Sequence, residues 1–232
     1  MATTSDRDRK PPSLGKLLRE GPALARLILS QFRRPPAWAR DGGDRRPVVV
    51  IPGFLANDAS TSLLRRTLEA AGFRAFGWGY GMNLGARADT LDRLAARLDA
   101  VIAEAGKPVS LVGWSLGGLY ARELARHRPG DVDLVVTLGT PFAVDLHANN
   151  AWRVYELIND HKVDNPPIPI ELDHKPPVRT VALWSRRDGI VAPASARGTA
   201  RGADETIEVD CRHMEFVSDP RALRAVIEVL TR

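Results

Sequence analysis

The segment Gly113-Trp114-Ser115-Leu116-Gly117 constrains the fold of this chain more than any other part of its sequence. An apolar run, residues 109–112, leads into it, and a stretch with helical spacing, residues 119–127, follows it. A serine hydroxyl stands exposed on a strained elbow when a strand, a sharp turn and a helix follow one another in this order. The two glycines have a steric reason, because side chains at a turn this tight would collide with neighbouring backbone. The sequence therefore predicts that Ser115 lies exposed between a buried strand and a helix.

Apolar and amphipathic stretches alternate along residues 47–232. Short apolar runs typical of buried parallel strands occupy residues 47–51, 73–78, 109–112, 134–138, 179–184 and 206–209. Helices are predicted at residues 60–71, 90–105, 119–127 and 152–158 and from residue 218 onward. Strands and helices that alternate at this spacing form an open sheet with helices packed on it. We therefore expect an α/β fold with a mostly parallel sheet of about six strands and helices on both faces.

The net charge of +5 is unevenly distributed along the chain. Residues 1–46 hold 11 Lys and Arg against 5 Asp and Glu, whereas residues 47–232 hold 22 against 23. A nucleic-acid-binding domain carries its basic patch on the folded part, so the nearly neutral domain argues against nucleic acid as a partner. No apolar run approaches the roughly 20 residues of a membrane span. The polar start of the chain and its single cysteine, Cys211, favour the cytoplasm as the compartment.

Residues 1–46 are predicted to form a basic extension and linker ahead of the domain. Apolar residues recur there at helical spacing, at Leu14, Leu17, Leu18, Leu24, Leu27, Ile28 and Phe32. Pro22 is expected to break or restart this helix, and residues 35–46 indicate a linker. Two interpretations stay open. The extension docks on the domain or forms a loosely ordered tail, which we favour, or its apolar stripe rests on an anionic membrane surface.

The interval between the fourth and fifth predicted strands, residues 141–177, is too long for an ordinary connection. It is polar, rich in proline late on, and has one predicted helix at residues 152–158. A segment of this length is usually functional or disordered. Because it leaves the carboxyl end of the sheet, we interpret it as a cap over the site, with a mobile surface insertion as the alternative.

A serine hydroxyl is a weak nucleophile at neutral pH and needs a base, which in turn needs a group that orients it. Asp188 and His213 each come directly after a predicted strand. Parallel strands release such loops at the same edge of the sheet, so both side chains can reach Ser115. The order Ser115, Asp188, His213 is the one expected after a nucleophile elbow. Taken singly, Asp188 could belong to an ordinary turn and His213 to a surface loop; taken together they predict a catalytic triad.

Acyl transfer also needs two amide donors aimed at the developing oxyanion. The N–H of Leu116, which follows the nucleophile, is one candidate. The other is the N–H of Phe54, in the loop after the first strand, with Leu55 as the alternative. An ordinary turn at the end of that strand would explain the same residues.

With these motifs in place, residues 47–232 resemble an α/β-hydrolase of the esterase/lipase type. The resemblance is carried by Gly-Trp-Ser-Leu-Gly-Gly, by Gly139-Thr140-Pro141, by the Asp-Gly-Ile-Val that starts at Asp188, and by the late His213. Many lipases have His-Gly where this chain has Pro52-Gly53. The resemblance implies hydrolysis of an ester or thioester through an acyl-enzyme, without a metal or an organic cofactor. The acidic and histidine residues of the insertion could be considered as metal ligands, but their spacing matches no known pattern of such ligands. They are Asp145, His147, Asp160, His161, Asp173 and His174.

The substrate is only broadly specified by the sequence. Four apolar residues near the predicted site suggest an acyl pocket, although such residues are as often part of the core: Leu55, Trp114, Phe142 and Trp152. A small-molecule acyl ester is the expected partner. Two other functions remain open. One is an acyltransferase or thioesterase with the same triad, and the other is a non-catalytic binding module with a vestigial triad.

Overall fold

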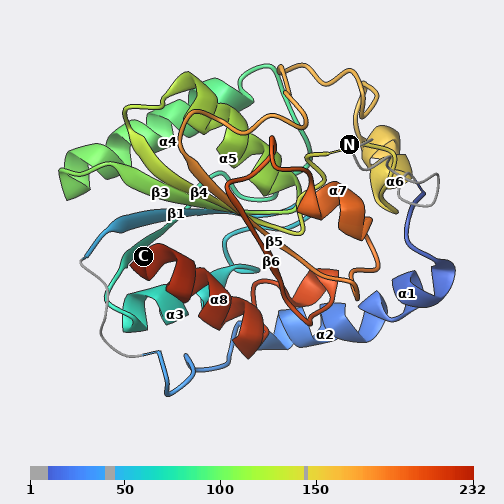
Figure 1. Cartoon of the computed structure of the whole chain (residues 1–232), viewed down its shortest axis with the longest axis horizontal. Coiled ribbons are helices and arrows are strands. Elements are labelled where there is room, and N and C mark those ends of the chain that lie inside the picture. The colour runs from blue at the N-terminus through green and yellow to red at the C-terminus, as the bar shows by residue number, and fades with distance from the viewer. Residues whose placement is uncertain (1–9, 40–44, 144–145) are drawn as a thin grey trace.

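The computed structural model describes residues 10–39, 45–143 and 146–232. Six strands form one parallel sheet in the order β2-β1-β3-β4-β5-β6. The strands are β1 (Pro47–Ile51), β2 (Arg74–Gly77), β3 (Val109–Trp114), β4 (Val132–Leu138), β5 (Arg179–Trp184) and β6 (Glu205–Glu208). The predicted α/β fold with about six mostly parallel strands and helices on both faces is confirmed (Figure 1).

Helices cover both faces of the sheet. On one face lie α4 (Thr90–Ala105) and α5 (Leu116–His127), and on the other lie α3 (Ser62–Ala70) and α8 (Pro220–Thr231) (Figure 1). Two shorter helices lie in connections between strands, α6 (Trp152–Ile158) and α7 (Pro193–Arg197), and the 3-10 turn η2 (His213–Glu215) lies between β6 and α8. The helix after the elbow begins at Leu116 instead of residue 119, because the turn at Ser115 leads into it without a connecting loop.

The core is divided by the sheet into two layers. Along β1, Val48 and Val50 pack with α3 and α8, whereas Val49 and Ile51 pack with α4 and α5. Burying a Val or Ile side chain contributes roughly 1.5–3 kcal/mol, so a strand with apolar residues on both sides is strongly held in the middle of the sheet. This packing fixes the position of the loop that leaves the end of β1.

Of the N-terminal helices α1 (Leu14–Leu18) and α2 (Glu20–Ser30), α2 packs against η2 on the domain and α1 adjoins α2 (Figure 1). The break lies at Arg19 and not at Pro22, because Pro22 falls in the first turn of α2, where a missing N–H costs nothing. The face of α2 that docks consists of Glu20, Ala23, Leu27 and Ser30. The remaining apolar residues stay exposed, among them Leu14, Leu18, Leu24, Ile28 and Phe32.

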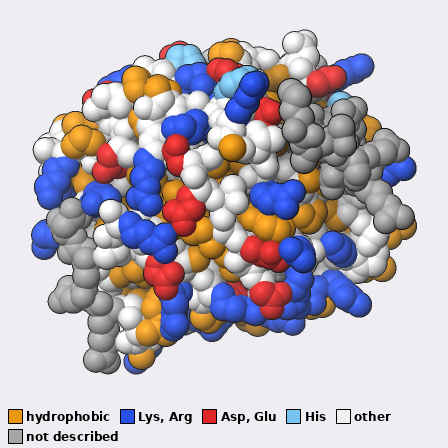
Figure 2. All heavy atoms as spheres, viewed as in Figure 1, with side chains coloured by type: hydrophobic (Ala, Val, Ile, Leu, Met, Phe, Trp, Pro, Cys, Tyr) orange, Lys and Arg blue, Asp and Glu red, His pale blue; other side chains and the backbone are white. Residues whose placement is uncertain are grey.

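Residues 40–44 of the predicted linker lie outside the described residues. Among the helices that the structure describes, none combines the length and the apolar character that crossing a bilayer requires. The face of the domain in Figure 2 mixes basic and acidic side chains. Several of the charged side chains form ion pairs, for example Arg187 and Arg221 with Asp210.

The inserted segment between β4 and β5 is anchored at its far end by a buried arginine. Arg122 of α5 donates to the carbonyl of His174 and to that of Gly202, both at 2.7 Å. Its guanidinium stacks 4.3 Å from the centre of the Phe142 ring. Burial and, to a smaller extent, the nearby charge of Arg126 lower the pKa of Arg122 to about 10. One side chain thus holds the beginning and the end of the insertion against α5.

Gly117 is a position where neighbouring backbone leaves no room for a side chain. A Cβ there would lie within 2.6 Å of the Pro52 carbonyl oxygen and closer still to that of Ile51. Because both obstacles are backbone, we expect Gly117→Ala to lower the free energy of unfolding by about 2 kcal/mol or more in urea denaturation.

Gly130→Ala is the matched control, because a Cβ at Gly130 meets nothing within 4 Å. We expect it to change the free energy of unfolding by less than about 0.5 kcal/mol. Equal effects of the two substitutions would contradict the steric explanation.

Candidate active site

Ser115 occupies a strained turn between β3 and α5. Its φ of 53° and ψ of −121° are unusual for a residue with a side chain. The turn is held by two hydrogen bonds, from the Ser115 N–H to the Leu138 carbonyl at 2.8 Å and from the Gly118 N–H to the Ser115 carbonyl at 2.9 Å. A Cβ at Gly113 would collide with the backbone of Gly117 and Gly118. The strain at the serine is therefore maintained by close backbone packing around it.

Asp188 and His213 form a buried hydrogen-bonded pair at the same edge of the sheet. His213 Nδ1 lies 2.8 Å from Asp188 Oδ2, and the two residues are 2% and 1% exposed. The other carboxylate oxygen, Asp188 Oδ1, accepts the N–H groups of Ile190 and Val191, both at 2.8 Å. With the carboxylate fixed in this way, the proton of a neutral His213 belongs on Nδ1, which leaves Nε2 to act as a base.

The surroundings of His213 favour its protonated form. Its ring lies 5.9 Å from the Trp114 ring and 6.2 Å from the Phe216 ring, between centroids. Burial by itself lowers the pKa of His213, but the charge of Asp188, its hydrogen bond and the charge of Glu20 together raise that pKa above its ordinary value of 6.5. An imidazolium formed during a reaction would therefore be stabilised here.

The loop after β1 lies against the elbow. A Cβ at Gly53 would come within 3.2 Å of the Ser115 Cβ, so the two turns touch. The Leu55 N–H already donates to the Asn83 carbonyl at 2.7 Å, which leaves Phe54 as the candidate donor. Within the described part of the chain, the N–H groups of Phe54 and Leu116 have no acceptor. Both predicted oxyanion donors are thus available.

Asn83 holds this loop in place. Its side-chain amide donates to the Pro52 carbonyl at 2.9 Å, and its own N–H donates to the Ala56 carbonyl at 2.8 Å. Asn83 is almost completely buried. The conformation of the loop between Pro52 and Ala56 is therefore set by one residue from outside the strand that carries it.

A narrow apolar cavity opens beside Ser115. Its volume, measured as the space open to the centre of a water molecule, is about 50 Å³. Most of its wall comes from the inserted segment, and the lining residues include Phe54, Ser115, Leu116, Leu119, Leu146, Trp152, Tyr155, Ile170, Ile190 and Val191. The inserted segment therefore covers the elbow from one side.

The four predicted substrate contacts lie in different places. Trp152 lines the cavity. Trp114 is buried on the α3–α8 side of the sheet and donates its indole N–H to the His213 carbonyl at 3.2 Å. Phe142 is fully buried beneath Arg122, and Leu55 is 46% exposed and does not line the cavity. Trp114 and Phe142 therefore serve packing and support, and neither belongs to the lining of the cavity.

Two residues of the site could not be assigned from the sequence. Tyr155 lines the cavity, and its hydroxyl accepts the Ala86 N–H at 3.1 Å and lies 2.9 Å from His161 Nε2, which ties α6 to the loop around Ala86. Burial raises the pKa of Tyr155. Glu20 of α2 accepts hydrogen bonds from the loops of both Asp188 and His213. The only sequence signal for Glu20 is its helical spacing with Ala23, Leu27 and Ser30.

Residues with metal-binding side chains do not gather in the insertion. No group of three or more His, Cys, Asp or Glu side chains in the described ranges is arranged to hold a metal ion, and Asp145 lies outside those ranges. His147 packs edge-on against Trp152, the first residue of α6, with 4.9 Å between ring centroids.

Comparison with known proteins supports the architecture. No protein-family model matches the sequence, and no curated protein matches it significantly. The mature lipase BlEst2 of Bacillus licheniformis is similar in structure, with a TM-score of 0.61 and 16% identity over 86% of this chain and 95% of that one. The naproxen esterase (carboxylesterase NP) of Bacillus subtilis has a TM-score of 0.57 and 14% identity over 96% and 100%. The pyrethroid hydrolase PytH has a TM-score of 0.56 and 16% identity over 80% of this chain and 97% of that one.

With its parallel six-stranded sheet, its covering helices and these structural neighbours, the chain has the α/β-hydrolase fold.

Proposed function

We propose that this protein is a serine hydrolase that cleaves carboxylic esters through an acyl-enzyme. The observation that carries the proposal is the buried Asp188–His213 pair, at 2.8 Å, at the same sheet edge as the strained turn of Ser115. Two N–H groups without acceptors in the described chain and an apolar cavity adjoin that turn. Solved structures with the same fold include a lipase and an esterase, which supports the same class of reaction.

Each group has one task in the proposed reaction. Ser115 Oγ attacks the acyl carbon while His213 Nε2 takes the hydroxyl proton, and the C–O bond to the leaving alcohol breaks as that proton passes to the alcohol. Asp188 keeps the Nδ1 proton in place and stabilises the imidazolium. The N–H groups of Leu116 and Phe54 bind the oxyanion. A water molecule, deprotonated by the same histidine, then attacks the acyl-enzyme and releases the acid and the free Ser115.

The cavity favours an ester with a small apolar acyl group. Its lining beside Ser115 consists mainly of apolar side chains such as Leu119, Trp152 and Val191, and its volume of about 50 Å³ is small. A charged acyl chain would lose its hydration there without gaining a partner. Transfer of the acyl group to an alcohol or amine in place of water is the alternative with the same triad. Product analysis with competing acceptors separates the two reactions.

Replacing Ser115 with Ala is expected to lower the turnover of p-nitrophenyl acetate and butyrate by roughly 10⁴-fold or more, since the nucleophile is removed. It should also abolish labelling by a fluorophosphonate probe. Ser62→Ala is the matched control, because the Ser62 hydroxyl makes no hydrogen bond in the described structure. Wild-type protein that neither turns over these esters nor reacts with the probe would be a non-catalytic binding module.

The raised pKa of His213 predicts the pH dependence of activity. Catalysis needs the neutral imidazole, so kcat/KM should fall on acidification with a midpoint above 6.5, the ordinary value for histidine. Asp188→Asn removes the charge that raises this pKa, so the midpoint should move to lower pH. The same substitution should lower kcat by roughly 10³–10⁴-fold, because the ring is no longer held in the correct tautomer. An unchanged midpoint would contradict the role of Asp188.

We also propose that α1 and α2 contact an anionic membrane surface. Apolar residues remain exposed on and directly after the docked helices, with Leu18 of α1 78% exposed and Phe32, two residues past the end of α2, 84% exposed. Basic side chains lie among and directly after these apolar residues in the sequence, at Lys16, Arg19, Arg26, Arg33 and Arg34. A basic amphipathic helix binds lipid through its apolar area and through attraction to anionic headgroups. A lipid-derived ester would then be presented near the site.

The membrane proposal predicts a defined loss of binding when the apolar residues are changed. The double substitution Leu18→Ser and Phe32→Ser should weaken sedimentation with phosphatidylcholine–phosphatidylserine vesicles by about tenfold or more, since exposed apolar anchors are removed. Vesicles of phosphatidylcholine alone should bind the wild type less. Equal partitioning of the wild type and the double variant would rule out contact through these helices.

A further inference from the structure

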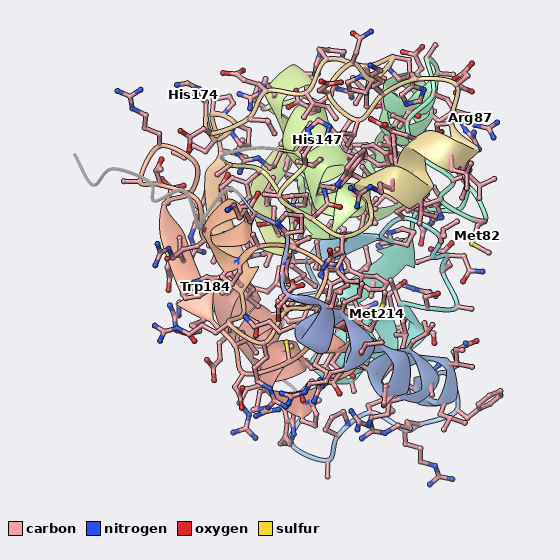
Figure 3. All side chains as sticks on the ribbon, turned by 90° about the vertical axis from the view of Figure 1, so that its right-hand side faces the viewer. Met82, Arg87, His147, His174, Trp184 and Met214 are labelled. Carbon is pink, nitrogen blue, oxygen red and sulfur yellow. The ribbon has the colours of Figure 1, made fainter. Side chains whose placement is uncertain are left out.

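Glu20 is a buried carboxylate in the N-terminal segment, far in sequence from every residue of the proposed triad. It is the first residue of α2 and only 4% exposed. Its carboxylate accepts three backbone N–H groups. Oε1 accepts those of Gly189 at 2.8 Å and His213 at 3.0 Å, and Oε2 accepts that of Met214 at 3.1 Å. Figure 3 shows Met214 beside the N-terminal helices.

The donors belong to the two loops that carry the acid and the base. Gly189 directly follows Asp188, and the other two donors are His213 itself and its neighbour. The carbonyl of His213 is held separately, by the indole N–H of Trp114 at 3.2 Å. The main chain of His213 is thus fixed on both sides, by Glu20 at its N–H and by Trp114 at its C=O. One carboxylate joins two loops whose relative position sets the 2.8 Å hydrogen bond between Asp188 and His213.

Further contacts fix the N-terminal segment against the same two loops. Lys16 Nζ donates to the Arg186 carbonyl at 2.7 Å, and Arg212 donates to the Arg19 carbonyl at 3.2 Å. The approach is close enough to require a glycine, since a Cβ at Gly189 would lie 2.5 Å from the Lys16 carbonyl oxygen and 2.9 Å from Glu20 Cγ. The glycine of the Asp188-Gly189 pair is thus required by close packing as well as by the turn. The position of Glu20 is therefore determined by the surrounding structure.

The charge of Glu20 acts on His213. Burying a carboxylate costs several kcal/mol unless hydrogen bonds or a counter-charge compensate it. Three N–H groups provide the hydrogen bonds, and among the described residues no Lys or Arg forms an ion pair with Glu20. Its charge therefore stays available to a neighbouring cation, and it contributes to the raised pKa of His213.

We propose that Glu20 is a positioning residue of the active site, which holds the Asp188 and His213 loops in register and stabilises the imidazolium formed during catalysis. This inference rests on the proposed function. It makes the N-terminal segment a part of the catalytic apparatus, and it predicts effects on catalysis that a purely structural glutamate would not have.

Two substitutions separate the positioning by Glu20 from its charge. Glu20→Gln keeps a carbonyl oxygen that can replace Oε1, but it removes the charge and sets an NH₂ group against the Met214 N–H. We expect kcat to fall about tenfold and the acid midpoint of kcat/KM to move to lower pH. Glu20→Ala removes all three hydrogen bonds, and kcat should fall about 100-fold because the triad loses its geometry. KM should change less than about threefold in both variants, since Glu20 is not in contact with the cavity.

Glu69→Gln is the matched control. Glu69 is exposed on α3, so the same chemical change there should leave kcat and the pH profile as in the wild type. Rates are compared below the unfolding temperature of each variant, per site labelled by a fluorophosphonate. If Glu20→Gln and Glu20→Ala unfold at lower temperature but keep the wild-type kcat and acid midpoint, Glu20 is only structural and the inference is overturned.

A second readout does not depend on ester turnover. The titration of His213 is followed by NMR through its imidazole Cε1–H signal, assigned by comparison with His213→Asn. We expect the midpoint to be lower in Glu20→Gln than in the wild type and Glu69→Gln. A wild type that cleaves no ester would remove the proposed function, while the shifted midpoint would still support the effect of Glu20 on His213. An unchanged midpoint in Glu20→Gln overturns the inference whatever the activity.

Discussion

The close approach of two turns at the end of the sheet is the constraint on which the active site depends. The first turn of α5 lies so near the end of β1 that a Cβ at Gly117 would meet the carbonyl oxygens of Ile51 and Pro52. The same packing brings Gly53 against Ser115. Because neither turn can accept a side chain at these points, the strained φ of Ser115 cannot relax without moving β1. The strain of the serine and the position of the Phe54 amide therefore have one physical cause.

A second constraint is electrostatic. Asp188 and Glu20 are both buried, and both carboxylates are satisfied chiefly by backbone N–H groups. His213 lies between them in contact with each, through its ring on one side and its N–H on the other. Two buried carboxylates around one imidazole favour a cation at that point. In the proposed reaction, this arrangement would stabilise the charge that His213 gains when it takes a proton, and it exists before any substrate enters.

The sequence predicts that three residues which each follow a parallel strand lie near one another. Loops after β3, β5 and β6 leave the same edge of the sheet, so Ser115, Asp188 and His213 could be grouped from their positions after predicted strands. The surroundings of Trp114 and Phe142 could not be predicted in this way. An apolar side chain near the sheet edge fits a cavity or the core equally well, and only the packing around Arg122 and His213 decides between them. Glu20 could not be found, since its partners are at least 169 residues away in the sequence.

The N-terminal segment, the inserted segment and the Asp188 loop meet at Asn150. Its side-chain amide donates to the carbonyl of Pro12 at 3.0 Å and to that of Gly189 at 2.8 Å. Its own N–H donates to the Ile190 carbonyl at 2.7 Å, so the start of the insertion runs beside the loop of the catalytic acid. Ile190 also lines the cavity and donates to Asp188. The wall of the cavity is therefore continuous with the contacts that support Asp188, so a displacement of the insertion would also displace that residue. In the reaction that we propose, the shape of the cavity and the geometry of the triad would depend on the same contacts, and Glu20 extends these contacts to the N-terminal helix α2.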